Sequence, residues 1–222
     1  DWQAIALSLR LAATAAALAL PLALPLAWLV AFGRFRGKLA LEAAVSLPLV
    51  LPPTVLGFYL LAALGPASPL GRAWESLTGG PLAFSFPGLV VALLIANLPF
   101  ILQPLVASLG AVDRRQLEAA ATLGAGPLRR YLEVALPLAW RGLAAGLVLA
   151  FAHGMGEFGM VLMVGANLPG RTRTASIALY DQVQALDYGA AHRTALFLLA
   201  VAFLVLLLSA WLRSREASWR RR

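Results

Sequence analysis

Long apolar stretches recur along this chain and set the strongest limit on its fold. Five of them approach the ~20 residues that a helix rising 1.5 Å per residue needs to cross about 30 Å of hydrocarbon. We expect these stretches to be helices, because lipid offers no partner for an unpaired backbone group. A closed β-barrel would instead show short alternating segments. The expected spans are residues 5–32, 43–64, 86–109, 138–161 and 194–212.

The composition favours the same class of protein. Of the 222 residues, 61% are hydrophobic and only 13% are charged, which is more apolar surface than a water-soluble fold can cover. We therefore predict an all-α, polytopic membrane protein, with one transmembrane domain over residues 1–222 and five spans, six being the alternative count. The first stretch exceeds the ~7–15 apolar residues of a signal peptide, so we count it as a span.

Cysteine usage and net charge exclude several function classes. The chain has no cysteine, so it has neither disulfides nor thiol-based metal sites, and we expect no metal site. The net charge is +8, but the arginines form short patches between apolar spans, which is typical of topology signals. We expect the lipid bilayer as a partner and no nucleic acid.

Basic residues also predict the direction of the chain. Patches follow the first, third and fifth spans, and basic patches beside spans face the cytoplasm. We therefore expect the N-terminus outside and the C-terminus in the cytoplasm. Arg171, Arg173 and Arg193 on the expected outer side count against this scheme. The patches are Arg34, Arg36 and Lys38; Arg114, Arg115, Arg129 and Arg130; and Arg213, Arg215 and the arginines at 220–222.

Prolines and small residues indicate how the spans pack. Prolines at positions 21, 25, 48, 52, 53, 99 and 104 predict kinks, which can line a pathway, although proline is common in membrane helices generally. Gly142, Gly146, Ala150 and Gly154 recur at every fourth position, so another helix can approach closely. Packing inside the subunit and packing across a dimer axis both stay open.

The connection between the third and fourth spans, residues 113–137, reads as two short helices. Asp113 with Gln116 predicts a helix start with a capping box, and Gly124 predicts its end. Gly126 and Pro127 predict a turn that opens a second helix. This shape can fill a groove on a partner protein, but by itself it names no function.

The loop contains Glu118-Ala119-Ala120, then Gly124 after three residues, and after nine more Val134, one residue and Leu136-Pro137. This spacing resembles the EAA motif of binding-protein-dependent ABC importer permeases. The resemblance implies a type I ABC importer permease fold, with the loop as coupling helices in a cleft of a separate ATP-binding subunit. Val134 stands where the family usually has isoleucine. The matching residues, implied to couple the permease to the ATPase, are Glu118, Ala119, Ala120, Gly124, Leu136 and Pro137.

The chain lacks an ATP site of the common kind. Its single lysine, Lys38, follows a span rather than a strand, and Leu39 stands where a phosphate-binding loop needs Ser or Thr. We expect no catalytic site and no cofactor on this chain, with ATP and magnesium bound by the partner ATPase.

Two ionisable residues, His153 and Glu157, fall near the outer part of the fourth span. Ionisable groups at membrane depth are costly and usually face a cavity or a partner. We take His153, Glu157, Phe158 and Gly159 as pore or gate candidates. Glu157 has the wrong sign to bind an anion, so we expect it to act in gating or helix positioning. A purely structural buried pair remains the alternative.

The same region resembles the molybdate permease subunits of ABC importers, with tungstate and sulfate permeases next. The resemblance implies a homodimer with one pore, two ATPase copies, a periplasmic oxyanion-binding protein and a bacterial or archaeal inner membrane. The expected function is import of molybdate or tungstate, with sulfate or thiosulfate as the alternative. The residues that carry it are Gly156 to Gly159, Asn167, Pro169, Gly170, Arg171, Thr172, Leu179 and Tyr180.

The expected outer surface follows this region. Arg171 and Arg173 are candidates for docking the periplasmic protein or attracting the anion, the alternative being an ordinary solvated loop. Apolar residues at every third position of residues 174–190 predict an interfacial or re-entrant helix. An ion-coupled secondary transporter would need acidic sites in paired half-sequences, and a membrane enzyme would need a catalytic cluster; the sequence shows neither.

Overall fold

The computed structural model describes residues 1–219, with side chains described up to residue 210, and this part of the chain contains helices and no strands. The arginines at 220–222 lie outside the described residues. The elements are α1 Trp2–Phe32, α2 Lys38–Val50, α3 Pro53–Leu64, α4 Pro69–Thr78, α5 Phe86–Gly110, α6 Arg114–Thr122, α7 Pro127–Arg130, the π-helical turn η1 Tyr131–Ala135, α8 Leu136–Leu138, α9 Trp140–Gly156, α10 Gly159–Gly165, α11 Ala175–Gln184 and α12 Tyr188–Trp219.

The membrane-spanning elements agree with the predicted class. In the part of the chain that the structure describes, three helices are long and apolar enough to cross a membrane: α1, α5 and the part of α12 up to Ala210. Two bent pairs, α2 with α3 and residues 127–138 with α9, also pass that test when each is taken as one unit. The described chain is therefore an all-helical, multi-pass membrane protein, with five spans if each bent pair crosses once.

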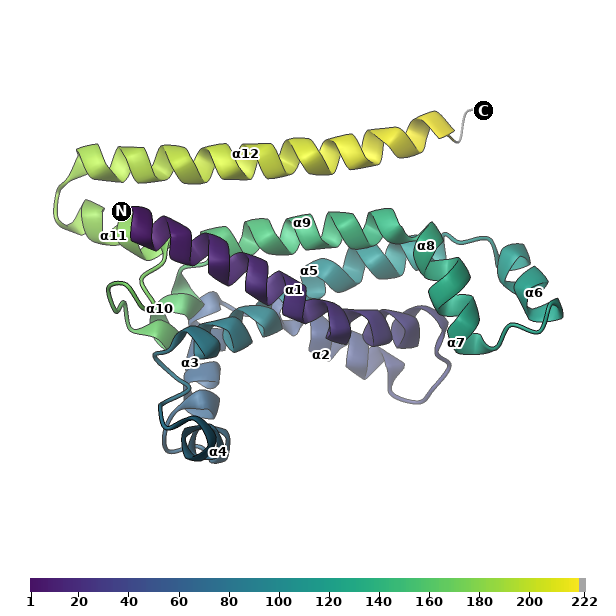
Figure 1. Cartoon of the computed structure of the whole chain (residues 1–222), viewed down its shortest axis with the longest axis horizontal. Helices are drawn as coiled ribbons and strands as arrows, with labels where there is room; N and C mark the ends of the chain where they lie inside the picture. Colours follow the sequence, from purple (N-terminus) through teal and green to yellow (C-terminus); the bar gives the residue numbers. More distant parts are fainter. Residues whose placement is uncertain (220–222) are drawn as a thin grey trace.

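Helix α5 forms the centre of the bundle and packs against α1 and α9 (Figure 1). The face of α1 toward the bundle consists largely of fully buried alanines, including Ala12, Ala15, Ala19 and Ala23. Small side chains bring helix backbones close together, which is how membrane helices gain packing energy where lipid supplies no hydrophobic drive. The sequence thus places leucines on α5 against alanines on α1.

The second predicted span is broken, which corrects the expectation of one helix over residues 43–64. Helices α2 and α3 meet at 112° across Leu51 and Pro52. Each of these residues precedes a proline, and a following proline disfavours the helical conformation. Leu51 and Pro52 accordingly have extended ψ angles of 138° and 134°. The prolines at 21, 25, 48, 99 and 104 instead lie inside single helices.

The small-residue face of α9 packs inside the subunit, which decides between the two arrangements left open above. A Cβ atom added to Gly146 would lie 2.8 Å from the Ile101 backbone, and one added to Gly142 would lie 2.6 Å from the Pro104 carbonyl oxygen. Both neighbours belong to α5. Backbone atoms cannot move aside as a side-chain end can, so these glycines set the distance between α9 and α5.

Gly146→Ala should therefore destabilise the bundle. Overpacking of this kind typically costs ~1–3 kcal/mol, and we expect a lower thermal unfolding midpoint in detergent. Gly156→Ala is the matched control, because a Cβ atom there meets nothing within 4 Å. Equal midpoints for the two variants would show that α9 and α5 are less tightly packed than described here.

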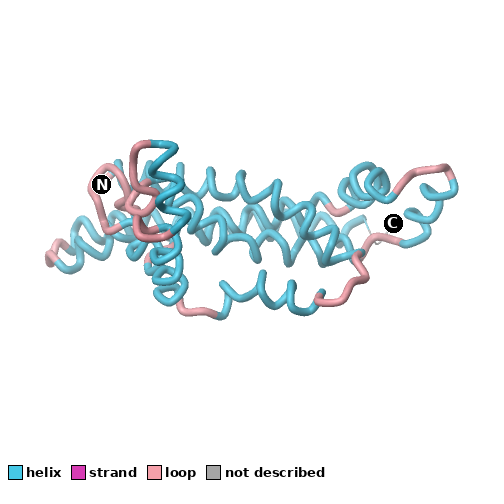
Figure 2. The backbone as a smooth tube through the Cα atoms, turned by 90° about the horizontal axis from the view of Figure 1, so that it is seen from below, coloured by secondary structure: helices cyan, strands magenta, loops and turns pink. Residues whose placement is uncertain are grey.

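The two ends of the bundle carry different elements. Helices α6 to α8, the end of α1 and the C-terminal end of α12 lie at one end, whereas the N-terminus, α10 and α11 lie at the other (Figure 1). Most loops also gather at these ends, with helices running between them (Figure 2). The basic residues after α1 and α5 thus share one end, as a common membrane side requires.

Candidate functional site

The 113–137 loop begins with a capped helix. The Asp113 carboxylate accepts a hydrogen bond of 2.9 Å from the Arg115 backbone N–H, so α6 starts where the sequence predicts. The backbone N–H of Gln116 donates to the Asp113 carbonyl. The return bond from the Gln116 side chain, which a full capping box needs, is absent from the contacts of the described residues.

Gly124 turns the chain at the end of α6. Its φ is +83°, in the left-handed region that side chains with a Cβ atom rarely adopt. The Gly124 N–H donates to the Ala121 carbonyl and the Ala125 N–H donates to the Ala120 carbonyl, each at 3.0 Å. These two bonds form a Schellman motif, which satisfies the last carbonyls of α6. Pro127 then opens α7, so the predicted helix, glycine corner and second helix are all present.

The loop protrudes from the bundle (Figure 1), and it carries exposed apolar side chains. Glu118 and Ala119 are exposed on α6, and Leu123 beside the glycine corner is 88% exposed. A large apolar side chain at the tip of a projecting loop is typical of a surface that a partner covers. Leu136 and Pro137 lie apart from this tip, on α8. They belong to the joint that leads into α9 rather than to the tip.

Tyr131 links this loop to the bundle, a contact that sequence reasoning missed. Its side chain is buried, its hydroxyl donates to the Leu24 carbonyl in α1 at 2.8 Å, and its ring lies 6.3 Å from the Trp28 ring. The chain is π-helical at Tyr131–Ala135 and bends by 71° before α9. A π-helical turn often marks a functional position. The 113–137 loop is thereby tied to α1 through Tyr131 and continues through α8 into α9.

A polar cluster joins α5 to α9, with Asn97 and Glu157 buried and His153 partly exposed. The His153 Nδ1 atom lies 2.9 Å from the Asn97 Oδ1 atom, and His153 Nε2 lies 3.6 Å from the Glu157 Oε2 atom. Phe100 stacks on the imidazole with ring centroids 4.2 Å apart. Asn97 is fully buried, and its Nδ2 atom has no partner among the described residues. Its signal in the sequence is an amide side chain within an apolar span, which Gln103 shares.

Glu157 occupies the junction of three helices. It lies in the break between α9 and α10 and is only 7% exposed. Its Oε1 atom accepts a hydrogen bond of 3.1 Å from the Met160 N–H in the first turn of α10. Its backbone carbonyl accepts one of 2.6 Å from the Ser176 hydroxyl in α11. These contacts support the helix-positioning role and bring Glu157 and His153 together as predicted.

The break beside Glu157 lies against the break between α2 and α3. A Cβ atom added to Gly159 would be 3.2 Å from the Pro53 Cβ atom, and one added to Gly57 would be 2.9 Å from the Met160 Cα atom. Helices α3 and α10 pack along each other. Phe158 turns the other way, and its ring lies 5.2 Å from that of Tyr180 on α11. Interrupted helices that meet inside a bundle are typical of transporters.

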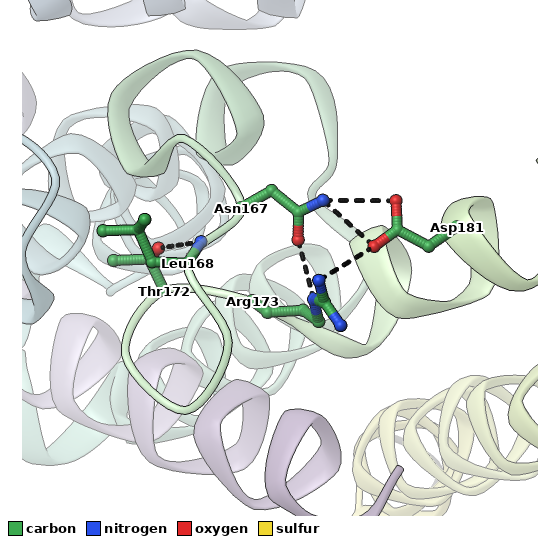
Figure 3. A network of polar contacts seen from close by, with 5 residues as sticks. All are labelled: Asn167, Leu168, Thr172, Arg173 and Asp181. Carbon is green, nitrogen blue, oxygen red and sulfur yellow. Dashed lines mark hydrogen bonds and ion pairs between the residues drawn. The ribbon is translucent and has the colours of Figure 1, made fainter.

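The loop after α10 is held by a polar network (Figure 3). The Asn167 amide donates to both Asp181 carboxylate oxygens, at 3.2 and 3.0 Å, and the Arg173 Nε–H donates to the Asn167 Oδ1 atom at 2.8 Å. Arg173 also forms an ion pair of 3.5 Å with Asp181. The Thr172 hydroxyl accepts from the Leu168 N–H and donates to the Gly165 carbonyl. The charge of Arg173 is thus paired with Asp181, and its side chain holds the loop in place.

Arg171 differs from Arg173, although the sequence treats the two alike. Its side chain is exposed, and no ion pair involves it among the described residues.

The predicted outer helix is also shorter than expected. Helix α11 ends at Gln184, and Leu186 has a left-handed φ of 60°. Ile177 on α11 is fully buried, whereas Tyr180 and Val183 are exposed, so the repeat at every third residue does not form one buried face.

Multiple spans, broken helices that meet in the bundle and a projecting two-helix loop define the class of polytopic membrane transport subunits. The chain belongs to the family described as binding-protein-dependent transport system inner membrane component, whose model matches residues 19–217. This match confirms the class that the spacing of the 113–137 loop predicts.

Several curated proteins are similar in sequence to this chain over nearly its whole length. The chain is 47% identical to the molybdenum transport system permease protein ModB of Azotobacter vinelandii, over 93% of this chain and 91% of that protein. It is 38% identical to the ModB protein of Escherichia coli strain K12, over 99% and 97%. A probable sulfate transport system permease protein cysT of Chlorella vulgaris is 32% identical, over 94% and 78%.

Solved structures support the fold. A chain of a bacterial alginate ABC transporter in complex with an alginate pentasaccharide-bound periplasmic protein superposes with a TM-score of 0.74, at 18% identity, covering 96% of this chain and 78% of the other. A chain of an amino acid ABC transporter with histidines gives a TM-score of 0.59 at 20% identity, covering 97% and 92%. The fold is therefore that of ABC transporter permeases.

Proposed function

We propose that this chain is the transmembrane subunit of an ABC importer that carries molybdate, or the nearly identical tungstate, into the cytoplasm. The observation that carries the proposal is the projecting 113–137 loop, with its exposed Leu123 tip and its Schellman corner at Gly124. Molybdate is favoured over sulfate because the ModB protein of Azotobacter vinelandii is 47% identical, against 32% for the cysT protein of Chlorella vulgaris.

The proposed partners are those that an ABC importer subunit needs. A separate ATPase subunit binds ATP and magnesium and docks on Glu118, Ala119, Ala120 and Gly124, while this chain supplies no catalytic group. Two copies form a homodimer around one pore, since one short chain cannot enclose a pathway and two-fold symmetry is the commonest solution. Each copy receives one ATPase subunit, and a periplasmic protein delivers the oxyanion.

The location follows from the basic patches and from the arrangement of the bundle. The chain lies in a bacterial or archaeal inner membrane, with the 113–137 loop and the C-terminus in the cytoplasm and the N-terminus outside. Helices α6 to α8 lie at the same end of the bundle as the last part of α12, which supports this orientation (Figure 1).

Reconstitution with the ATPase subunit and the loaded periplasmic protein tests the function. We expect ATP-dependent uptake of molybdate into proteoliposomes, with competition by tungstate and weak competition by sulfate. ATP turnover should rise when the loaded periplasmic protein is added. Uptake that follows an ion gradient and ignores ATP would identify a secondary transporter instead, and stronger competition by sulfate would identify a sulfate permease.

The two outer arginines should behave differently. Arg171→Gln removes an exposed charge and should weaken binding of the periplasmic protein, with a steeper loss at low salt, because exposed charges are screened at high salt. Arg173→Gln removes an arm of the network with Asn167 and Asp181, so it should lower the thermal midpoint as well. The check is the affinity of the periplasmic protein and the midpoint of each variant. If both variants changed the affinity and the midpoint equally, Arg171 and Arg173 would not have the different roles proposed for them.

A further inference from the structure

A cavity opens beside the 113–137 loop, at the junction of α1, α6 and η1. Its volume is about 490 Å³, within the range of ~300–1,000 Å³ that is usual for small-ligand sites. Its walls are mostly apolar and aromatic, with one cationic side chain among them. The residues that line it include Trp28, Leu29, Phe32, Leu117, Arg130 and Tyr131.

Arg130 gives this cavity its chemistry. The guanidinium Nε atom is buried and has no hydrogen-bond partner among the described residues, although such an atom normally finds one. The neighbouring Arg129 instead points to solvent and pairs with Glu133 at 2.7 Å. Arg130 as a whole is only partly buried, so its charged fork stays open to a ligand at the cavity. An arginine with an unpaired buried Nε–H favours an anion, and its planar fork suits phosphate in particular.

An apolar track leads away from the cavity along α1. Leu18, Leu22, Leu29 and Phe32 are exposed along one face of this helix. The eleven steps along the helix from Leu18 to Leu29 extend about 16 Å at 1.5 Å per residue, close to half of the ~30 Å hydrocarbon core. The track therefore has the length of one leaflet, and it ends where Trp28 and Tyr131 provide the aromatic side chains that are common at membrane interfaces.

We infer that the cavity holds an anionic phospholipid, with the headgroup phosphate on Arg130 and an acyl chain along the exposed face of α1. A second copy of this chain is a poor occupant, because it would have to bring a carboxylate to Arg130 and the chain has only 10 acidic residues against 18 basic ones. The inference is independent of the proposed substrate. Only the choice of leaflet, the cytoplasmic one, rests on the proposed orientation.

Because Tyr131 lines this cavity and also donates to Leu24 of α1, the lipid would lie against the contact that joins the 113–137 loop to the bundle. It would fill the space between that loop and the end of α1. The lipid is thus placed to stabilise the loop against α1.

Fluorescence quenching tests the inference on the permease with its ATPase partner in nanodiscs. Brominated phosphatidylglycerol and brominated phosphatidylcholine are compared, and subtraction of the Trp28→Phe variant isolates the signal of Trp28. We expect half-maximal quenching at an about fivefold lower mole fraction of the anionic lipid, which corresponds to the ~1 kcal/mol that one basic residue contributes.

Arg130→Gln should abolish this preference, Arg130→Lys should retain part of it, and Arg129→Gln should leave it intact as the matched control. An undiminished preference in Arg130→Gln would overturn the inference. If that variant does not fold, an undiminished preference in Arg130→Lys would overturn it. Absence of quenching by either lipid would mean that protein covers the face. Displacement of the anionic lipid by inorganic phosphate would mean a site for free anions.

Discussion

Gly124→Val should leave the permease in the membrane but separate ATP hydrolysis from transport. Valine is strained at a φ of +83°, and a side chain with a Cβ atom pays ~1–2 kcal/mol in the left-handed region, which corresponds to a population shift of about 5- to 30-fold. The Schellman bonds of Gly124 and Ala125 would be lost, and with them the angle between α6 and α7. The docking surface of α6 would then no longer be presented correctly.

The measurement is molybdate uptake per ATP hydrolysed in proteoliposomes at saturating ATP. Gly126→Ala is the matched control in the same loop, because Gly126 has a φ of −66° and a Cβ atom there meets nothing within 4 Å. Gly124→Asn should fall between the two, since asparagine tolerates the left-handed region better than valine does. Normal uptake by Gly124→Val would contradict the coupling role of this corner.

Glu157→Ala should reduce both transport and stability. The substitution leaves the buried Met160 N–H without its acceptor, and a buried group left unsatisfied costs ~1–3 kcal/mol. It also removes the carboxylate that lies 3.6 Å from Nε2 of the partly exposed His153 ring. Glu157→Gln keeps an oxygen that can accept from Met160 but loses the charge beside His153. We therefore expect it to retain most of the thermal stability and to lose transport in part.

Uptake and the thermal midpoint should be measured together for both variants. Glu75→Ala is the control, because Glu75 is exposed on α4, away from the helix junctions. If Glu157→Ala transports normally, Glu157 does not position the helices that move. A loss of stability with full transport in the folded fraction would leave Glu157 as a structural residue only.

Much of the fold follows from local chemistry that the sequence carries. Apolar length predicts the spans, and glycine and proline predict the ends of α6 and the start of α7, because their backbone preferences act within a few residues. The break at Leu51 and Pro52 was predicted only as a kink. Two consecutive prolines stop a helix, but the 112° angle depends on α3 packing against α10.

The candidate site was predictable where its residues are close in sequence. His153 and Glu157 are one helical turn apart, so their contact follows from helix geometry. Asn97 and Tyr131 were missed because their partners lie 56 and 107 residues away, and no local pattern encodes such pairs. The difference between Arg171 and Arg173 depends likewise on the fold, which brings Asp181 to one of them.

The contact between Gly159 and Pro53 limits how this subunit can deform. Two interrupted spans would ordinarily give two independent hinges, but these two breaks lie against each other, so we expect a change of angle at one to displace the other. Packed interiors switch between discrete arrangements rather than bending continuously. We therefore expect the two breaks of one subunit to move as a linked pair, and a two-fold assembly would have two such pairs beside its pathway.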